Sequence, residues 1–380
     1  MSFDPETATF LIAGPVRIHP RVLRAMSMPS LNHRSDYFHG IMAEIRELLP
    51  VMFGAKGAQA VLTGSGTAGL EAVYSSLLRP DGRTLVVTNG NFGDRTDKIA
   101  RRYSGTVTTL KAPWGQHFPV EETRAELEKG DVRALCIVHN ETSVGLRNDL
   151  AAIAPAVRKS GALFLVDGIS AVAGVPTPIE EWGIDALVAG SQKGLAAPAG
   201  LAMVHLSPRA VKELRSGTFY LDLAEHLKSL EKNDTPWTPG VPLFLALREA
   251  LLLLKEEGLE GRLKRTHELA EATRAATDAL GLKLLSERAH ASDTVTAILN
   301  PEGMEDAQVR KVLQNQYNVL LQGGQGALTG KIFRIGHMGI ASWADLLVTF
   351  AGLERILAKA GRLPTPGAGV RAIVERMPSA

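Results

Sequence analysis

The sequence predicts an α/β fold with a mostly parallel sheet, followed by a smaller α+β domain. Between about residues 60 and 205, short continuous apolar runs alternate with amphipathic stretches of helical period. Such runs are typical of strands covered on both faces, and strands that alternate with helices form parallel sheets. After Gly258 the pattern changes to a long charged helix with few strands, which indicates a second, different architecture.

The helices and strands expected between about residues 60 and 205 follow from the local pattern of apolar residues. The intervening helices include Gly69–Leu78 and Leu150–Lys159. Ligands bind beyond the carboxyl ends of the strands in such sheets, so functional residues are expected just after each apolar run. The expected strands are apolar runs bounded by Gly, Asn, Asp or Ser, namely Leu85–Thr88, Ala134–Val138, Leu163–Val166, Ala186–Ala189 and Leu201–His205.

The C-terminal part has its own pattern of helices and strands. Pro and Gly in residues 363–369 predict a flexible linker before a short final helix. We therefore expect an N-terminal segment over residues 1–16, a large domain over 17–258 and a small domain over 259–380. The elements expected in the small domain are a helix over Leu259–Leu280, a strand over Thr294–Leu299, a helix near Asp306–Gln314, strands over Val319–Leu321 and Ile332–Ile335, and a helix from Trp343 to about Lys359.

The composition excludes several classes of function. The 380 residues carry 42 basic and 40 acidic side chains, without the basic surplus of a nucleic-acid-binding protein. The single cysteine, Cys136, cannot form an intramolecular disulfide, which suits a reducing compartment. The first residues lack the pattern of a secretion signal, and no apolar stretch approaches the roughly 20 residues that span a membrane. The ten histidines are scattered, so we expect a cytoplasmic protein with no metal, nucleic-acid or membrane partner.

A glycine-rich turn opens the first helix of the α/β part. Residues Thr63 to Gly69 read Thr-Gly-Ser-Gly-Thr-Ala-Gly, and the helix is expected to start near Leu70. A helix N-terminus presents free N–H groups and the positive end of the helix dipole, so the turn suits a phosphate. Alone, it fits a Ser- or Thr-capped turn equally well. The dinucleotide fingerprint additionally requires a strand directly before the turn and an acidic residue about 20 positions on, so we do not interpret the turn as one.

Two further residues fall where strands end. Asp167 follows the run Leu163–Val166, and a carboxylate buried there requires a cation or several donors. Lys193 follows the run Ala186–Ala189, in a partly desolvated position where a lowered pKa makes an amine a nucleophile. Alone, Asp167 fits a turn cap and Lys193 a surface position. Together with the glycine-rich turn they supply the three contacts of pyridoxal phosphate (PLP), which are phosphate, ring nitrogen and aldehyde.

The sequence resembles the class V aminotransferases, which are fold type I PLP enzymes, and within them the serine–pyruvate and alanine–glyoxylate aminotransferase group. The resemblance covers about Phe10 to Lys359 and implies a mostly parallel seven-stranded sheet sandwiched by helices. It rests on an ordered set of stretches, Gly14-Pro15-Val16 with Asn32-His33-Arg34-Ser35, Gly64-Ser65-Gly66-Thr67, His139-Asn140-Glu141-Thr142-Ser143, Val166-Asp167-Gly168-Ile169-Ser170, Ser191-Gln192-Lys193-Gly194 and Phe333-Arg334-Ile335-Gly336-His337-Met338-Gly339.

The resemblance implies roles toward the cofactor. Lys193 is expected to form the Schiff base with PLP, and Asp167 to pair with the protonated ring nitrogen. Thr238 is expected to reach the phosphate bound by a second copy, which implies a homodimer with shared active sites. The remaining contacts are expected from Ser65, Gly66, Thr67 and Gln192 at the phosphate, from Thr142 at the 3-oxygen of the ring, and from Phe92 on the ring face, where the family often has a tryptophan.

The resemblance also implies where the substrate binds. Arg334 is expected to hold the α-carboxylate, as a planar guanidinium pairs with a carboxylate through two hydrogen bonds. Gly14 is expected to approach the substrate with its backbone, and His33 and Arg34 either line the pocket or pack against it. No second arginine is marked for a side-chain carboxylate. We therefore expect ping-pong transfer from a small amino acid, of the serine or alanine type, to a 2-oxo acid such as pyruvate or glyoxylate.

Several alternatives stay open or are disfavoured. An aspartate- or aminophosphonate-using aminotransferase would use the same scaffold. A PLP lyase or cysteine desulfurase is less favoured, because a desulfurase needs a cysteine on a mobile loop and Cys136 lies in an expected core strand. A nucleotide-binding regulator without catalysis would also use the glycine-rich turn. A serine hydrolase is disfavoured because G-x-S-x-G is missing.

Overall fold

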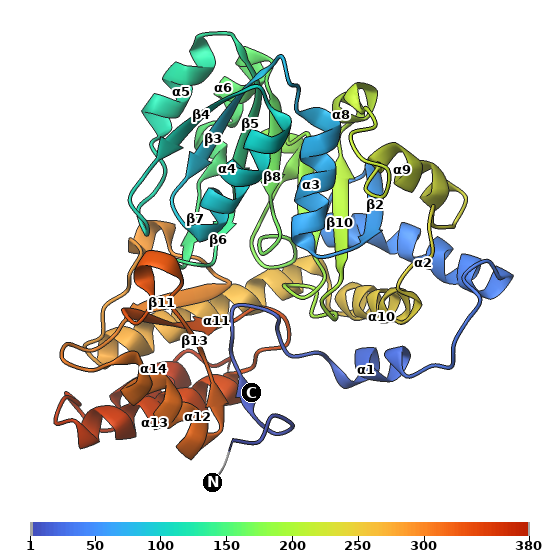
Figure 1. Ribbon diagram of the computed structural model, residues 1–380. Helices are drawn as coiled ribbons and strands as arrows, with labels where there is room; N and C mark the ends of the chain where they lie inside the picture. The colour runs from blue at the N-terminus through green and yellow to red at the C-terminus, as the bar shows by residue number, and fades with distance from the viewer. Residues whose placement is uncertain (1–2, 379–380) are drawn as a thin grey trace.

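The computed structural model describes residues 3–378, and a seven-stranded sheet with helices on both faces is its largest element (Figure 1). The strand order is β2-β10-β9-β8-β5-β3-β4, and every neighbouring pair is parallel except the two pairs that contain β10. The mostly parallel seven-stranded sheet is therefore confirmed. Its strands are β2 (Ala58–Thr63), β3 (Arg83–Thr88), β4 (Thr106–Lys111), β5 (Val132–Val138), β8 (Leu163–Asp167), β9 (Ala186–Gly190) and β10 (Leu201–Leu206).

The five strands expected from apolar runs are present, whereas β2 and β4 were missed. β4 lies at the edge of the sheet, and its polar sequence Thr-Val-Thr-Thr-Leu-Lys is half-buried or exposed, so it carries no continuous apolar run. β2 directly precedes the glycine-rich turn, so the strand that a dinucleotide fingerprint requires is present. The acidic residue of a dinucleotide fingerprint is still missing, because β3 ends at Thr88 and is followed by Asn89.

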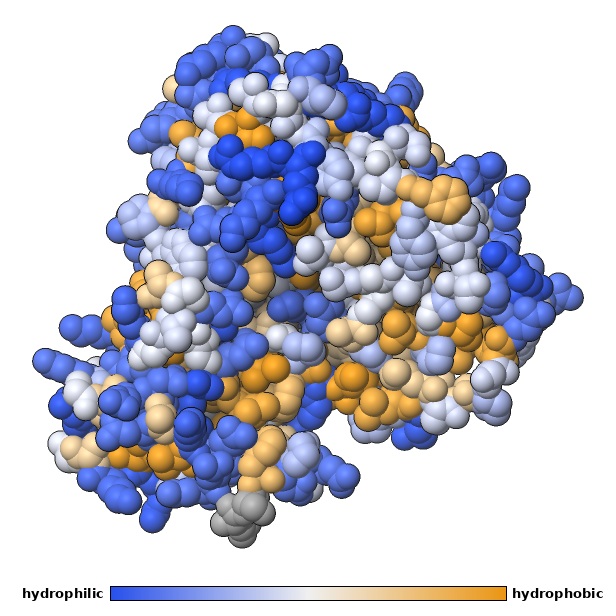
Figure 2. All heavy atoms as spheres, viewed as in Figure 1, coloured by the Kyte–Doolittle hydropathy of each residue, from blue (hydrophilic) through white to orange (hydrophobic). Residues whose placement is uncertain are grey.

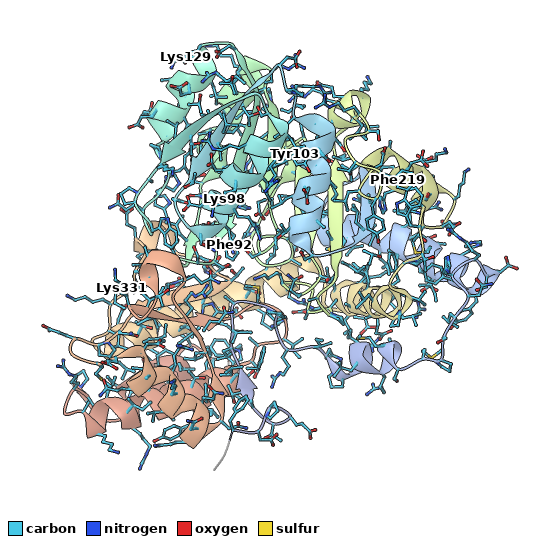
Figure 3. The ribbon with its side chains drawn as sticks, viewed as in Figure 1. Phe92, Lys98, Tyr103, Lys129, Phe219 and Lys331 are labelled. Atoms are coloured by element: carbon cyan, nitrogen blue, oxygen red, sulfur yellow. The ribbon has the colours of Figure 1, made fainter. Side chains whose placement is uncertain are left out.

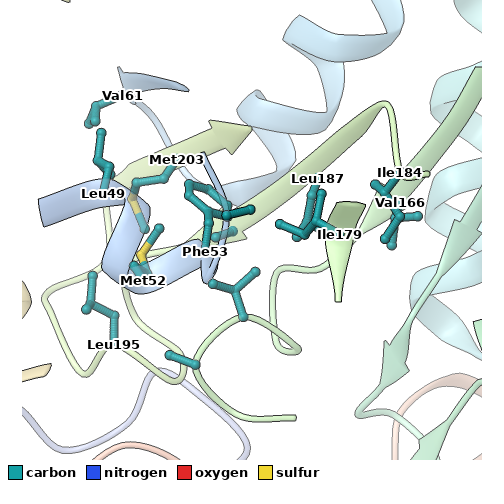
Figure 4. Packing of buried hydrophobic residues seen from close by; sticks show 14 of the residues in the cluster. Leu49, Met52, Phe53, Val61, Val166, Ile179, Ile184, Leu187, Leu195 and Met203 are labelled. Carbon is teal, nitrogen blue, oxygen red and sulfur yellow. The ribbon is translucent and has the colours of Figure 1, made fainter. Parts of the chain in front are cut away.

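Two apolar clusters cover the two faces of the sheet, since alternate residues of a strand point to opposite faces. Leu187 belongs to one cluster and its neighbour Val188 to the other. Figure 4 shows the first cluster, in which Phe53 of one covering helix lies near Met203 of β10. That cluster includes side chains of α2 (Asp36–Phe53), α5 (Val120–Glu128), α6 (Ala154–Ser160) and α10 (Val241–Glu257), and the other includes side chains of α3 (Gly66–Leu77), α4 (Asn91–Tyr103) and α8 (Pro208–Glu213).

Helix α3 begins at Gly66 and not near Leu70, so the glycine-rich stretch forms its first turn. Gly69 lets this helix approach the sheet closely. A Cβ atom at Gly69 would lie 2.7 Å from Val188 Cγ1 and 2.8 Å from Ala202 Cβ, closer than real side chains pack. The short approach fixes the N-terminus of α3 at the edge of the sheet where β8 and β9 end.

The C-terminal part contains a three-stranded antiparallel sheet of order β11-β14-β13, with helices packed beside it. The helix expected near 306–314 differs, since Ala307–Lys311 forms a π-helical turn that continues into α12 (Val312–Tyr317). Leu11 packs in the apolar cluster of this part. The domain boundaries stay a prediction. The elements are α11 (Leu259–Ala279), β11 (Val295–Leu299), β12 (Val319–Leu320), β13 (Gln322–Gly323), β14 (Ile332–Gly336), α13 (Trp343–Lys359) and α14 (Ala368–Val374).

Shorter elements connect these parts. β1 pairs in parallel with β12, so the start of the chain joins the C-terminal part. Among residues 3–378, no helix is both long and apolar enough to cross a membrane. The connecting elements are β1 (Thr9–Phe10), α1 (Pro20–Met26), β6 (Asn140–Glu141), β7 (Leu146–Arg147), α7 (Ile179–Trp182) and α9 (Leu223–Glu231), with single 3₁₀ turns at Leu150–Ala152, Arg288–His290 and Gly326–Leu328.

The segment 363–369, predicted to be a flexible linker, is held by a buried carboxylate. Glu354 of α13 accepts hydrogen bonds from the backbone N–H groups of Gly367 (2.7 Å), Gly369 (2.8 Å) and Val370 (3.0 Å). These are N–H groups at the start of α14, which have no partner inside the helix. The carboxylate therefore caps α14 and ties it to α13.

Glu354→Ala is expected to lower the free energy of unfolding by about 2–3 kcal/mol, because three N–H groups lose a charged acceptor. Urea denaturation followed by circular dichroism measures the loss, and amide exchange in residues 367–374 should become faster. Glu375→Ala, at the exposed C-terminal end of α14, is the control. An unchanged unfolding midpoint for Glu354→Ala would contradict the capping role.

Candidate active site

A cavity of about 220 Å³ lies at the carboxyl ends of the central parallel strands. Nine of the eleven residues predicted for the site line it, and Arg334 and Thr238 do not. Most of the residues predicted from separate parts of the sequence therefore meet in one cavity, at the edge where β3, β5, β8 and β9 end. The lining residues are Gly14, Ser65, Gly66, Thr67, Phe92, Arg95, Val138, Asn140, Thr142, Asp167, Ile169, Ser170, Gln192 and Lys193.

Lys193 projects from the turn after β9 and is almost completely buried. Its Nζ donates a hydrogen bond to the carbonyl oxygen of Ala13 at 2.5 Å. Burial is the main cause that lowers the pKa of the ammonium from 10.5 to about 8, and the positive charges of Arg334 and Arg95 act in the same direction. Roughly a tenth of the amine is therefore uncharged at pH 7, and this is the form that a nucleophile or base requires.

The N-terminal segment closes over this lysine. Gly14 has a φ of 101°, and a Cβ atom there would lie 2.5 Å from Lys193 Nζ. Only glycine fits this backbone conformation and this contact. Ala13 N–H donates to Gln322 Oε1 at 3.2 Å, so the same segment is also bonded to the C-terminal part. Gly14 thus lies in the cavity, beside the amine.

Asp167 ends β8 and is only 3% exposed. Its Oδ1 accepts from the N–H of Ile169 at 3.0 Å, and its Oδ2 accepts from Arg95 Nη2 at 2.7 Å. Arg95 was missed by the sequence analysis. The signal was its position three residues after Phe92 in α4, where a helix places two side chains on one face. The Arg95 guanidinium carbon lies 4.8 Å from the centre of the Phe92 ring.

The first turn of α3 forms a cradle for an anion. Ser65 is the N-cap residue, yet its hydroxyl makes no capping hydrogen bond, so both it and the first N–H groups of the helix are available. Gln192 Oε1 is buried and has no hydrogen-bond partner within residues 3–378. A Cβ atom at Gly66 would lie 2.6 Å from Ile169 Cδ1, so glycine keeps this part of the cavity open.

These features fit PLP. The cradle suits its phosphate, Asp167 suits a protonated ring nitrogen, and Lys193 suits its aldehyde. Phe92, at the first turn of α4 (Figure 3), offers an aromatic face at the same cavity.

Glu141 is a second buried carboxylate beside the cavity, and the sequence analysis gave it no role. Its Oε2 accepts from the N–H groups of Phe92 (3.0 Å) and Gly93 (2.9 Å), and its Oε1 accepts from the Ser143 hydroxyl at 2.5 Å. Burial raises the pKa of this carboxyl, and the hydrogen bonds from Ser143 and Gly93 oppose the rise. Glu141 therefore caps α4 and fixes the backbone that carries the Phe92 ring.

Arg334 lies in β14, behind Thr142. Its guanidinium donates to the carbonyl oxygen of Thr142 at 2.8 Å and to that of Gly323 at 2.8 and 3.0 Å. Burial lowers its pKa to about 10. Three of the five N–H groups are thus used, and two remain for a ligand. Arg334 reaches the cavity edge through Thr142 and is not part of the wall.

The remaining predicted residues lie outside the cavity. Thr238 is exposed, and His33 is half-buried away from the lining residues. Arg34 is paired with Asp234 at 2.5 Å and donates to the carbonyl oxygen of Thr235 at 2.7 Å, so within one chain it packs the surface.

Two alternative chemistries find little support in the side chains. Burial raises the pKa of Cys136 to about 12, and the thiol lies inside β5, so it is not placed as the nucleophile of a desulfurase. In the part of the chain that the structure describes, no three His, Cys, Asp or Glu side chains are grouped to hold a metal ion.

The rate at which PLP attaches to Lys193 is expected to rise with pH through a midpoint near 8, the pKa of this lysine. Below that value the ammonium has no free electron pair, and above it the amine attacks the aldehyde. Borohydride trapping at successive pH values, followed by peptide mass spectrometry, measures the profile. Lys193→Arg is the control that should yield no labelled peptide. A midpoint near 10.5 would contradict the effect of burial.

Comparison with known proteins identifies the family. Residues 21–341 match the family model of class-V aminotransferases. The chain is 37% identical to a serine–glyoxylate aminotransferase of Methylorubrum extorquens, over 97% of this chain and 95% of that protein. It is 38% identical to a protein of Synechococcus named soluble hydrogenase, small subunit, over 97% of both.

A solved structure agrees with this match. The structure of ureidoglycine–glyoxylate aminotransferase from Bacillus subtilis superposes with a TM-score of 0.91 at 33% identity and covers 97% of both chains. The chain belongs to the class-V aminotransferases, a PLP-dependent family of fold type I.

Proposed function

We propose that this chain binds PLP and transfers the amino group of a small amino acid, of the serine or alanine type, to glyoxylate or pyruvate. The observation that carries the proposal is the meeting of Lys193, Asp167 and the N-terminus of α3 around one cavity. Each of these residue types is common alone. A buried amine, a buried carboxylate and an anion cradle at a single strand edge match the three polar groups of PLP.

Different residues of the cavity contact different parts of the cofactor. PLP, when bound, withdraws electrons from the α-carbon of an attached amino acid. Ser65, Gly66, Thr67 and Gln192 hold its phosphate. Asp167 balances the positive charge of its ring nitrogen, and Thr142 contacts its 3-oxygen. Phe92 covers one face of its ring.

Lys193 moves the proton. Its pKa of about 8 leaves enough neutral amine to take a proton from the substrate α-carbon, and the resulting ammonium can return it. The burial that lowers this pKa also excludes water from the amine. The Ala13 carbonyl, 2.5 Å from Nζ, limits the directions in which the amine can move.

Arg334 orients the substrate. Its bonds to the carbonyl oxygens of Thr142 and Gly323 hold the guanidinium plane, so the two remaining N–H groups point in a fixed direction. An α-carboxylate bound there stands next to Thr142, a residue of the cofactor cavity. Arg334 is therefore the residue proposed to select α-amino acids.

The lining of the cavity favours small donors. Arg95 is the only arginine in the lining, so the lining holds no guanidinium besides the one that contacts Asp167. The aminotransferase relatives named above are both glyoxylate aminotransferases, which supports glyoxylate as the acceptor. A donor such as aspartate or an aminophosphonate is the alternative, and it would require a second cation, either Arg95 released from Asp167 or a residue outside this lining.

The hydrogenase name of the Synechococcus relative is not carried over. Metal centres of redox enzymes rely on several cysteine thiolates. This chain has one cysteine, Cys136, and it lies in a core strand. The cavity of this chain, in contrast, is lined by a lysine, a carboxylate and an anion cradle.

A homodimer with shared active sites is the second part of the proposal. Five of the eight exposed large apolar side chains in residues 3–378 are Leu23, Met28, Tyr37, Phe219 and Tyr220, which flank or belong to α1, α2 and α9. Figure 2 shows apolar side chains gathered on this side of the molecule, over α10. Phe219, 77% exposed, packs against Trp237, next to Thr238, with the ring centroids 4.4 Å apart and the rings tilted by 31°. A second copy would cover these aromatics and bring Thr238 to the phosphate of its neighbour.

The chain is expected to sediment at twice its mass of 40.7 kDa. Phe219→Glu places a charge among these aromatics, so it should shift the chain toward monomer and reduce PLP retention several-fold. Val348→Glu, at an exposed position of α13, is the matched control. Sedimentation velocity and dialysis against PLP-free buffer give the two measurements. A wild-type monomer that retains PLP would contradict the shared site.

Purified protein is expected to be yellow and to aminate glyoxylate or pyruvate faster with serine or alanine than with aspartate or glutamate. Lys193→Ala should lose on the order of 10³-fold or more in turnover, because base and attachment point are removed together. Oxo-acid products quantified by chromatography across a donor panel provide the measurement. Aspartate activity without serine or alanine activity would reverse the donor order, and an active, yellow Lys193→Ala variant would overturn the function.

A further inference from the structure

Arg95 makes contacts that closely match those of the proposed cofactor. Its Nη2 donates to Asp167 Oδ2 at 2.7 Å, as the ring nitrogen of PLP would. Its Nη1 donates to Thr67 Oγ1 at 3.2 Å, a hydroxyl of the phosphate cradle. Its guanidinium lies over the Phe92 ring, 4.8 Å from the ring centre. One planar cation thus uses three of the groups that the cofactor requires.

The inference rests on the proposed cofactor. We infer that Arg95 competes with PLP for Asp167, Thr67 and the face of Phe92, so that cofactor loading requires the Arg95 side chain to move away. A guanidinium and a protonated pyridine are both flat cations that donate N–H bonds and stack on aromatic rings.

The positive charges of Arg95 and of a protonated PLP ring disfavour binding of both beside Asp167. Asp167 Oδ1 already accepts from Ile169, so Oδ2 is the oxygen that both cations need. Two cations on one buried carboxylate repel each other where the dielectric is low. Between residues 3 and 378, Arg95 is the only cationic side chain within salt-bridge distance of Asp167. Arg95 is therefore the residue that competes with the cofactor for Asp167.

The Arg95 side chain is more accessible than the carboxylate that it contacts. It is 26% exposed, whereas Asp167 is 3% exposed. Within residues 3–378, Arg95 Nε is buried without a hydrogen-bond partner, so only the two terminal nitrogens hold the guanidinium by hydrogen bonds. Competition of this kind lowers the apparent affinity for the cofactor by the fraction of molecules in which Arg95 has moved.

The test uses the full-length, cofactor-free chain and 4′-deoxypyridoxine 5′-phosphate, which lacks the aldehyde and so cannot react with Lys193. Stopped-flow fluorescence at pH 8 gives the binding rate at rising probe concentrations. In the wild type the observed rate should level off, because departure of Arg95 limits it. In Arg95→Gln the rate should stay linear, and the affinity should be about tenfold tighter, as expected when a state populated to about one tenth becomes dominant.

Two further variants sharpen the result. Arg102→Gln removes a positive charge from the same helix at an exposed position away from the cavity, and it should behave as wild type. Arg95→Lys keeps a cation for Asp167 but stacks poorly on Phe92, so it should load faster than wild type. It also serves as the test if Arg95→Gln does not fold.

The outcomes separate the two proposals. Slower or weaker probe binding by both Arg95 variants, or rates equal to wild type, would overturn the competition while leaving PLP as the cofactor. No probe binding by any variant at millimolar concentration would overturn the proposed cofactor, and the competition with it.

Discussion

A negative charge at the end of β8, removed from water, is the constraint around which the site is organised. Asp167 is 3% exposed, and a carboxylate desolvated to this extent is stable only beside a cation or good donors. Arg95 and the Ile169 N–H provide them. The same charge attracts the ammonium form of Lys193 and so opposes the much larger effect of its burial. The balance leaves the Lys193 ammonium with a pKa of about 8.

Helix α4 carries two of the residues that line the cavity, Phe92 and Arg95. The Glu141 carboxylate accepts hydrogen bonds from N–H groups in the first turn of this helix. The carbonyl oxygen of the next residue, Thr142, accepts one from Arg334. Two neighbouring residues of one short segment therefore position the Phe92 ring and the Arg334 guanidinium. The bonds of Glu141 and of Thr142 both involve backbone groups. A shift of this segment would therefore move the Phe92 ring and the Arg334 guanidinium together.

Much of this arrangement was predictable, and the rest depends on contacts that one sequence does not reveal. Lys193 and Asp167 were singled out because buried parallel strands leave continuous apolar runs, and both residues lie at the cavity where these strands end. β4 was missed because an edge strand needs no such run. Arg95 and Glu141 were missed because their partners are backbone groups or residues far along the chain. The partners of Arg334, two carbonyl oxygens, carry no sequence signal at all.

The pairing of β1 with β12 has a consequence for anyone who handles this protein. The amino-terminal segment contributes Leu11 to the C-terminal apolar cluster, pairs its strand there, and supplies the carbonyl oxygen that Lys193 contacts. A chain shortened past Ala13 would lose all three at once. Affinity tags and protease sites therefore belong at the opposite terminus, and removing the residues up to and including Ala13 would change the surroundings of the Lys193 amine.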